Sequence, residues 1–275
     1  MGIQFLIDSA SDILPEEAQK MEITCIPMQV TFGEDIYQDG VSLSNEEFYT
    51  KLASCNTLPA TSQINPAVYE DYFAKLTENG DQLVVITLSS RLSGTYQSAL
   101  IAAEEYAGKV FVVDSLNAAV GERLVLLRGL QLKEQGLSAE QIAKTLDEEK
   151  QTIRLVAMID TLEYLKKGGR ISAAVAFAGA ALGIKPAIQI KDGNVAMAGK
   201  ARGIKQCHNL LKQLIDDAGE IDRDKPVAAV FSASDEGLQQ FFADYPELTA
   251  PGYGLGCTIG THIGPGAYGL AFFQK

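Results

Sequence analysis

Apolar and polar residues follow two alternating patterns along the first 150 residues. Short apolar runs rich in β-branched side chains, such as residues 83–88, predict buried strands. Longer stretches with apolar residues three or four positions apart, such as residues 96–107, predict helices. The same reasoning predicts strands at residues 4–7, 23–32 and 109–113, and helices at residues 15–20, 118–135 and 138–150. Strands that alternate with helices at this spacing indicate an α/β fold with a doubly wound parallel sheet.

Capping residues mark two further helix starts. Ser44, with Glu47 three residues later, matches a capping box. Asn65 before Pro66 is a second start signal, because proline suits the first turn of a helix. The acidic stretch 33–40 shows neither pattern, and we expect it to form a turn.

The pattern changes after residue 150. A strand is predicted at residues 152–159 and a helical turn at 161–167, and Asp192-Gly193 between two apolar runs predicts a hairpin. Further helices are expected at residues 202–218 and 234–243 and strands at 185–191, 195–198, 227–231 and 267–273, with a glycine-rich loop before the last strand. These mixed elements predict that residues 1–150 form the α/β domain and residues 151–275 a second, α+β domain with a mixed sheet.

Hydroxyl-bearing residues directly follow the predicted strand at residues 83–88. The stretch 89–99 reads SSRLSGTYQSA and leads from that strand into a helix. Open α/β sheets bind ligands at the carboxyl ends of their strands, and a helix start offers unpaired N–H groups to an anion. Ser93 is a candidate N-cap, and Gly94 allows a ligand to approach the backbone. The alternative is that these hydroxyls only cap the helix.

Composition narrows the classes of function. The chain has 275 residues and a formal net charge of −12, which argues against non-specific binding of nucleic acid. An anionic membrane surface would repel the average face, although a local basic patch would permit transient membrane contact. The four cysteines are scattered and form no CxxC pair, and residues 3–7 lead into a strand without a signal-peptide pattern. We therefore expect a cytoplasmic protein with reduced thiols and no metal site.

An enzyme is the main alternative to a binding protein. Ser93 or Ser90, His262 and an aspartate (Asp8, Asp12 or Asp114) supply the residue types of a serine hydrolase triad. The G-x-S-x-G elbow of many such hydrolases is absent from the sequence, as is a G-x-x-x-x-G-K-[ST] phosphate loop. Cleavage of a lipid-like ester through Ser93 and His262 stays open as the second hypothesis.

Several short motifs in order along the chain resemble the DegV family of bacterial fatty-acid-binding proteins. The motifs are Asp8-Ser9-x-Ser11-Asp12, Thr61-Ser62-Gln63, Ser89-Ser90-x-Leu92-Ser93-Gly94-Thr95, Val113-Asp114-Ser115, Leu162-Glu163-Tyr164-Leu165-Lys166-Lys167-Gly168-Gly169-Arg170-Ile171 and Gly260-x-His262-x-Gly264-Pro265-Gly266. The resemblance covers essentially the full length. It implies a protein of two domains that holds one long-chain fatty acid.

In this family, members of the FakB type carry the acid to a separate ATP-dependent fatty acid kinase (FakA type). The kinase converts the carboxylate to an acyl phosphate for phospholipid synthesis, and the binding protein performs no chemistry and needs no cofactor. The resemblance implies carboxylate contacts at Thr61 and Ser93, with Ser62 and Gly94 beside them on loops of the first domain. It places Arg202 and His262 around the head group and Arg170 where the family has a basic residue important for the kinase step.

Small residues dominate the stretch 172–182, which the sequence predicts to be helical. Its alanines leave room for an acyl chain beside the helix, and Phe177 would close or shape the cavity. The expected acyl-pocket residues are Ala174, Phe177, Ala178 and Ala181. The alternative is that small residues here only permit tight helix packing.

Overall fold

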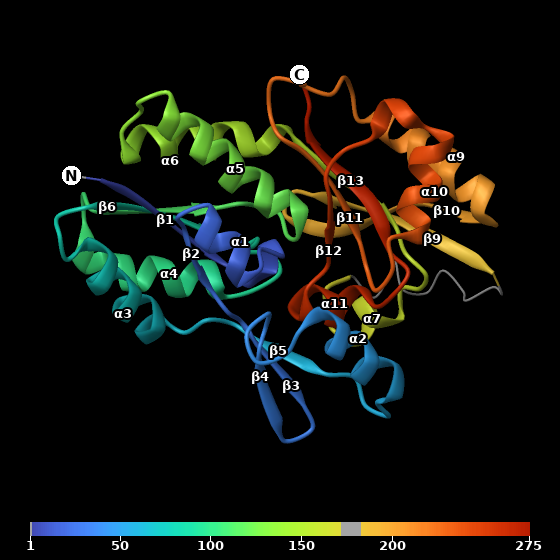
Figure 1. The fold of residues 1–275 in the computed structure, drawn as a ribbon, viewed down its shortest axis with the longest axis horizontal. Helices are drawn as coiled ribbons and strands as arrows, with labels where there is room; N and C mark the ends of the chain where they lie inside the picture. Colours follow the sequence, from blue (N-terminus) through green and yellow to red (C-terminus); the bar gives the residue numbers. More distant parts are fainter. Residues whose placement is uncertain (1, 172–182) are drawn as a thin grey trace.

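The computed structural model describes residues 2–171 and 183–275 (Figure 1). A parallel sheet in the order β2-β1-β6-β7 forms the centre of the N-terminal half. Its strands are β1 (Ile3–Asp8), β2 (Thr24–Ile26), β6 (Gln82–Thr87) and β7 (Val110–Asp114). The interior of β6 is buried on both faces, which explains why its sequence is a continuous apolar run.

Helices cover both faces of this parallel sheet (Figure 1). Helices α3 (Pro66–Thr77) and α4 (Thr95–Ala103) pack on one face, and α5 (Val120–Glu134) and α6 (Ala139–Glu149) pack on the other. The predicted doubly wound arrangement is therefore confirmed. The shorter helices of this half are α1 (Pro15–Lys20) and α2 (Asn45–Ser54), and α2 begins with the predicted capping box of Ser44 and Glu47.

The C-terminal half contains a mixed sheet in the order β10-β9-β8-β13-β11-β12. Its strands are β8 (Ile153–Met158), β9 (Ile184–Lys191), β10 (Asn194–Arg202), β11 (Val227–Phe231), β12 (Gly252–Gly254) and β13 (Tyr268–Phe273). Helices α9 (Ile204–Asp217) and α10 (Glu236–Asp244) cover one face. Helix α5 contacts β8, β11 and β13, so it lies between the two sheets and joins their cores.

The hairpin turn of this sheet is confirmed. Asp192 and Gly193 both adopt positive φ, as a tight two-residue turn between β9 and β10 requires. The hairpin tip reaches the N-terminal half, where Ser89 Oγ donates to Gly193 O at 2.7 Å. All described strands of the parallel sheet precede residue 150, and those of the mixed sheet follow it. The division into two domains at residue 150 stays a prediction.

The prediction of a single strand at residues 23–32 is wrong. The chain forms β2 and then β3 (Gln29–Phe32), which belong to different sheets. Pro27 lies between them, and a proline has no N–H to continue a ladder. The predicted turn at residues 33–40 contains β4 (Asp35–Gln38), which pairs with β3. Together with β5 (Ala60–Ser62) these strands form a small antiparallel sheet in the order β4-β3-β5.

Three features near the candidate site also differ from the sequence prediction. Arg202 is the last residue of β10 and does not start a helix. Gly203, at φ +81°, turns the chain between β10 and α9. Gly94, not Ser93, is the N-cap of α4. The glycine-rich loop contains a helix, α11 (Cys257–Ile263), whose last turn carries His262. Helix α7 (Glu163–Lys167) matches the predicted helical turn.

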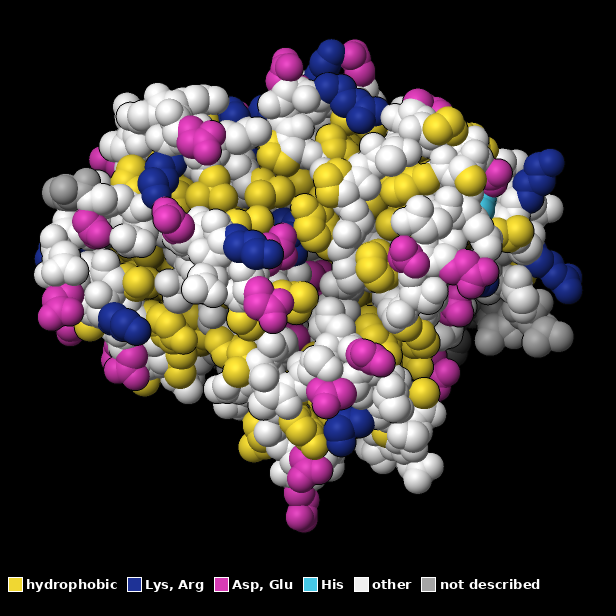
Figure 2. Space-filling model, in the orientation of Figure 1, with side chains coloured by type: hydrophobic (Ala, Val, Ile, Leu, Met, Phe, Trp, Pro, Cys, Tyr) yellow, Lys and Arg dark blue, Asp and Glu magenta, His cyan; other side chains and the backbone are white. Residues whose placement is uncertain are grey.

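Charged side chains are dispersed over one face of the molecule. On the face shown in Figure 2, Lys and Arg side chains are scattered among acidic and neutral ones. Within residues 2–171 and 183–275, no helix has the length and apolar character needed to cross a bilayer. The predicted helix at 172–182 lies outside the described residues.

Candidate functional site

A cavity lies between the two halves of the molecule. It contains about 870 Å³ of space not occupied by atoms, including the space at its opening. Strands β8 and β9 contribute one wall, and the loops at the carboxyl ends of the parallel strands contribute another, together with α11. Among the described residues, the polar side chains that line the cavity are Thr61, Ser62, Gln63, Ser93, Arg170, Thr258 and His262.

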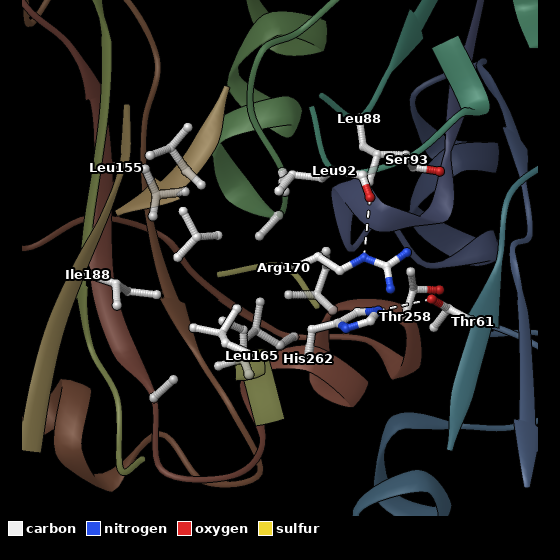
Figure 3. A pocket seen from close by; sticks show the side chains of 18 of the residues that line it. Thr61, Leu88, Leu92, Ser93, Leu155, Leu165, Arg170, Ile188, Thr258 and His262 are labelled. Atoms are coloured by element: carbon white, nitrogen blue, oxygen red, sulfur yellow. Dashed lines mark hydrogen bonds between the residues drawn. The ribbon is translucent and has the colours of Figure 1, made fainter. Parts of the chain in front are cut away.

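The sheet wall of the cavity is apolar. Leu155 and Ala157 on β8, with Ile159 just beyond it, face the cavity because alternate residues of a strand point to the same side. Ile188 and Ile190 of β9 continue this surface. Figure 3 shows that Leu155 and Ile188 lie at one end, whereas the labelled polar side chains gather at the other. The cavity therefore has an apolar end and a polar end.

Thr61 and His262 meet at the polar end. Thr61 Oγ1 and His262 Nε2 are 2.9 Å apart and hydrogen-bonded, although the residues are 201 positions apart in the chain (Figure 3). Thr61 lies on β5, and His262 lies in the last turn of α11. Burial, together with the positive charge of Arg170, lowers the pKa of His262 to about 4. The imidazole is therefore neutral at pH 7.

The surroundings of His262 decide which ring nitrogen carries the proton. Its Nδ1 is buried and has no hydrogen-bond partner among the described residues. It faces Gly168, where an added Cβ would overlap the ring. An N–H at this position would be buried without an acceptor, so we place the proton on Nε2. Nε2–H then donates to Thr61 Oγ1, which leaves the Thr61 hydroxyl proton free to donate into the cavity.

Ser93 lies on the central turn, beside the start of α4. Its Oγ is 2.9 Å from Thr95 Oγ1 and accepts from Thr95 N at 3.3 Å. Gly94 is not among the described lining residues, but its lack of a side chain allows Gln63, just after β5, to pack against the turn. A Cβ on Gly94 would overlap the side chain of Gln63. The structure therefore brings Thr61, Ser62 and Ser93 to the same end of the cavity.

Arg170 is half-buried at the polar end. Its Nε donates to Leu92 O at 3.3 Å (Figure 3), and Nη1 donates to Gly168 O at 2.6 Å. Within the described part of the chain, no acidic side chain forms an ion pair with Arg170. Neutral carbonyls hold the guanidinium in place and leave its charge available to an anion.

Other predicted site residues lie elsewhere. Arg202 is not among the described residues that line the cavity, and its role at the head group stays a prediction. The acyl-pocket candidates Ala174, Phe177, Ala178 and Ala181 lie outside the described residues. The sequence analysis missed the apolar faces of β8 and β9. It also missed Thr258, which lies four residues before His262 and so shares its helix face.

Gly168→Ala is expected to disturb the Thr61–His262 pair. Gly168 has an ordinary φ of −74°, so the backbone accepts alanine, and the harm comes from overlap with the His262 ring. We expect ligand affinity to fall roughly 10-fold and stability to fall by about 1–3 kcal/mol, as for other overpacked sites. Calorimetric titration and urea unfolding measure the two effects. In a His262→Ala background the same substitution should cost little, and equal costs in both backgrounds would contradict this account.

His262 is expected to make folding stability depend on pH. Because its folded pKa of about 4 lies below the ordinary 6.5, the unfolded chain binds more protons between these values. Its contribution to stability is thus fully present above pH 6.5 and is lost as pH falls through 4. The difference in free energy of unfolding between wild type and His262→Gln should shrink by up to about 3 kcal/mol across this range. Urea unfolding at several pH values tests this, and a constant difference would refute it.

Comparison with known proteins shows one family over the whole chain. A family model described as an uncharacterised protein of the DegV family matches residues 2–275. A DegV domain-containing protein from Deinococcus radiodurans is 33% identical over 281 residues, which cover 98% of each chain.

Solved structures show the same similarity. A DegV family protein from Thermus thermophilus, whose structure is described as showing fatty acid binding, superimposes with a TM-score of 0.90 at 30% identity over 100% of both chains. A stearic acid-binding protein from Eubacterium ventriosum gives a TM-score of 0.88 at 28% identity, over 100% of this chain and 99% of that one. The α/β architecture with its two main sheets is thus that of known fatty-acid-binding structures.

Proposed function

The chain belongs to the DegV family, and on that premise we propose that it binds one long-chain fatty acid in the cavity between its halves. The carboxylate lies at the polar end, near Thr61 and Ser93, and the acyl chain lies along the apolar faces of β8 and β9. The observation that carries this proposal is the division of the cavity into an apolar and a polar end. The apolar end suits the acyl chain of a fatty acid, and the polar end suits its carboxylate.

The acyl chain supplies most of the affinity. Burial of a methylene group contributes about 0.8 kcal/mol, so about 14 methylenes contribute on the order of 11 kcal/mol before the costs of association. Each hydrogen bond to the charged carboxylate contributes roughly 1.5–3 kcal/mol. The apolar wall therefore sets how tightly the ligand binds, and the hydroxyls of Thr61 and Ser93 fix which end faces Arg170.

We further propose that the protein presents the carboxylate to a separate ATP-dependent fatty acid kinase. A carboxylate oxygen of the bound acid attacks the γ-phosphorus of ATP, the bond to the β-phosphate oxygen breaks, and acyl phosphate and ADP form. The binding protein supplies no reacting group. Arg170 supports this proposal, because it lines the polar end of the cavity and pairs with no acidic side chain among the described residues, and a guanidinium suits phosphate oxygens.

The hydrolase hypothesis lacks a triad in the described residues. His262 Nε2 bonds Thr61 and not Ser93, and His262 Nδ1 meets no carboxylate. The candidate aspartates do not bond His262, because their carboxylates accept hydrogen bonds from backbone N–H groups. Asp8 accepts from Ala10 and Leu88, Asp12 from Gly256, and Asp114 from Ser90 and Leu116. The described residues therefore form no serine–histidine–aspartate triad.

Titration of delipidated protein tests the binding proposal. We expect palmitate and oleate to bind with one site per chain and to be recovered unchanged. A p-nitrophenyl ester should not be cleaved above the background rate. Absence of binding to every long-chain acid tried would contradict the proposal. Ester cleavage that His262→Ala abolishes would instead support the hydrolase hypothesis.

A further inference from the structure

Thr258 has an unsatisfied hydroxyl at the polar end of the cavity. The residue is only 3% exposed and lines the cavity. Its Oγ1 is buried and has no hydrogen-bond partner in the described parts of the chain. Figure 3 shows Thr258 next to Thr61 and His262. A buried hydroxyl without a partner is costly, so its position against the cavity calls for a ligand group that would satisfy it.

The position of Thr258 in α11 explains why its hydroxyl has no partner. A threonine inside a helix commonly donates to the carbonyl four residues earlier. Thr261 does so, and its Oγ1 donates to Cys257 O at 2.8 Å. For Thr258 the corresponding residue is Gly254, which lies in β12 before the helix begins. No helical carbonyl is therefore available to Thr258.

Helix α11 is also held firmly in place, which fixes where the backbone of Thr258 lies. Asp39 accepts from Cys257 N at 2.9 Å and from Thr258 N at 3.1 Å. Asp12 accepts from Gly256 N at 2.8 Å. At the next turn Gly260 packs against Phe48 of α2 so closely that a Cβ would overlap the ring. These buried contacts fix the start of the helix and so the position of the Thr258 backbone beside the cavity.

We propose that Thr258 is a third hydroxyl ligand of the fatty-acid carboxylate, beside Thr61 and Ser93. An ionised carboxylate has about four acceptor sites on its two oxygens, so Thr61 and Ser93 leave room for another donor. Thr258 lies one helical turn before His262, on the same face, and His262 already contacts Thr61. This inference rests on the proposed fatty-acid binding and adds a head-group residue that the sequence motifs do not assign.

Thr258→Val tests the assignment, because valine keeps the branched shape and removes only the hydroxyl. We expect palmitate to bind roughly 10-fold more weakly or worse, since a hydrogen bond to a charged group is lost. The loss should be smaller for methyl palmitate, which carries no charge. Thr258→Ser should bind palmitate nearly as wild type does. The lipid-free Thr258→Val protein should melt no lower than wild type, because its unpaired hydroxyl is gone.

Thr261→Val is the matched control on the same helix. Its hydroxyl is bonded within α11, and Thr261 is not among the described lining residues. This variant should lower the melting temperature but leave palmitate affinity unchanged. If Thr258→Val does not fold, Thr258→Ala replaces it in the same comparison with Thr258→Ser.

Two results would overturn the assignment while leaving fatty-acid binding intact. One is palmitate affinity in Thr258→Val equal to that of wild type. The other is an equal loss for palmitate and methyl palmitate, which would indicate a change of cavity shape. Failure of the wild-type protein to bind any long-chain acid would instead refute the proposed function, and this inference with it.

Discussion

Replacing Thr61 by valine and Ser93 by alanine in one chain is expected to weaken palmitate binding by roughly 100-fold, since two hydrogen bonds to a charged carboxylate are lost. Thr61 lies on an edge strand and Ser93 on a turn, and both line the cavity. Valine suits the strand at position 61, so the fold should survive. Calorimetric titration of the delipidated double variant measures the loss of affinity.

Ser62→Ala tests the neighbouring hydroxyl, which the resemblance places beside the carboxylate contacts. Ser62 also lines the cavity, but its side chain is exposed, and its Oγ meets Gln29 Oε1 at 3.5 Å. Its removal should leave palmitate affinity within about twofold of wild type, as for most surface substitutions. Normal acyl phosphate formation by the double variant with a fatty acid kinase would show that the carboxylate site is assigned wrongly.

Arg170→Ala is expected to separate lipid binding from the kinase reaction. The apolar wall and the hydroxyls stay in place, so palmitate should bind nearly as in wild type. Acyl phosphate formation with the kinase and ATP should fall on the order of 100-fold, as when one charged or polar stabiliser of a reacting group is removed. Measurement of bound palmitate and of acyl phosphate on the same samples tests both parts.

Arg154→Ala controls for the loss of an arginine as such. Arg154 also donates to backbone carbonyls, those of Gln151 and Ile153, and it is not among the described residues that line the cavity. Its removal should affect neither measurement. Loss of palmitate binding in Arg170→Ala would show that Arg170 belongs to the carboxylate site itself and not to the step with the kinase.

Local patterns predicted much of the fold because the signals are physically strong. The β-branched run at 83–88, the capping box at Ser44 and the Asp192-Gly193 turn each favour one structure over its alternatives. Prediction failed where tertiary contacts decide the outcome. Helix α11 forms within a glycine-rich stretch because Asp39 caps it from another part of the chain.

The site could likewise be predicted where local motifs mark its residues, and not where contacts between distant residues decide. The motif residues Thr61, Ser93, Arg170 and His262 lie together at one end of the cavity (Figure 3), and their roles in binding stay predictions. Which hydroxyl His262 contacts is not visible in the sequence, since Thr61 and His262 are 201 positions apart. Thr258 was missed for a related reason. Its place beside His262 depends on a helix that the sequence did not reveal.

Native mass spectrometry of the purified protein, followed by extraction and identification of the bound molecule, tests the central claim most directly. We predict a mass above that of the bare chain by one long-chain fatty acid, recovered unchanged on extraction. This result would also reveal the preferred acyl chain. A protein that is purified empty and takes up neither palmitate nor oleate when they are added would contradict the claim.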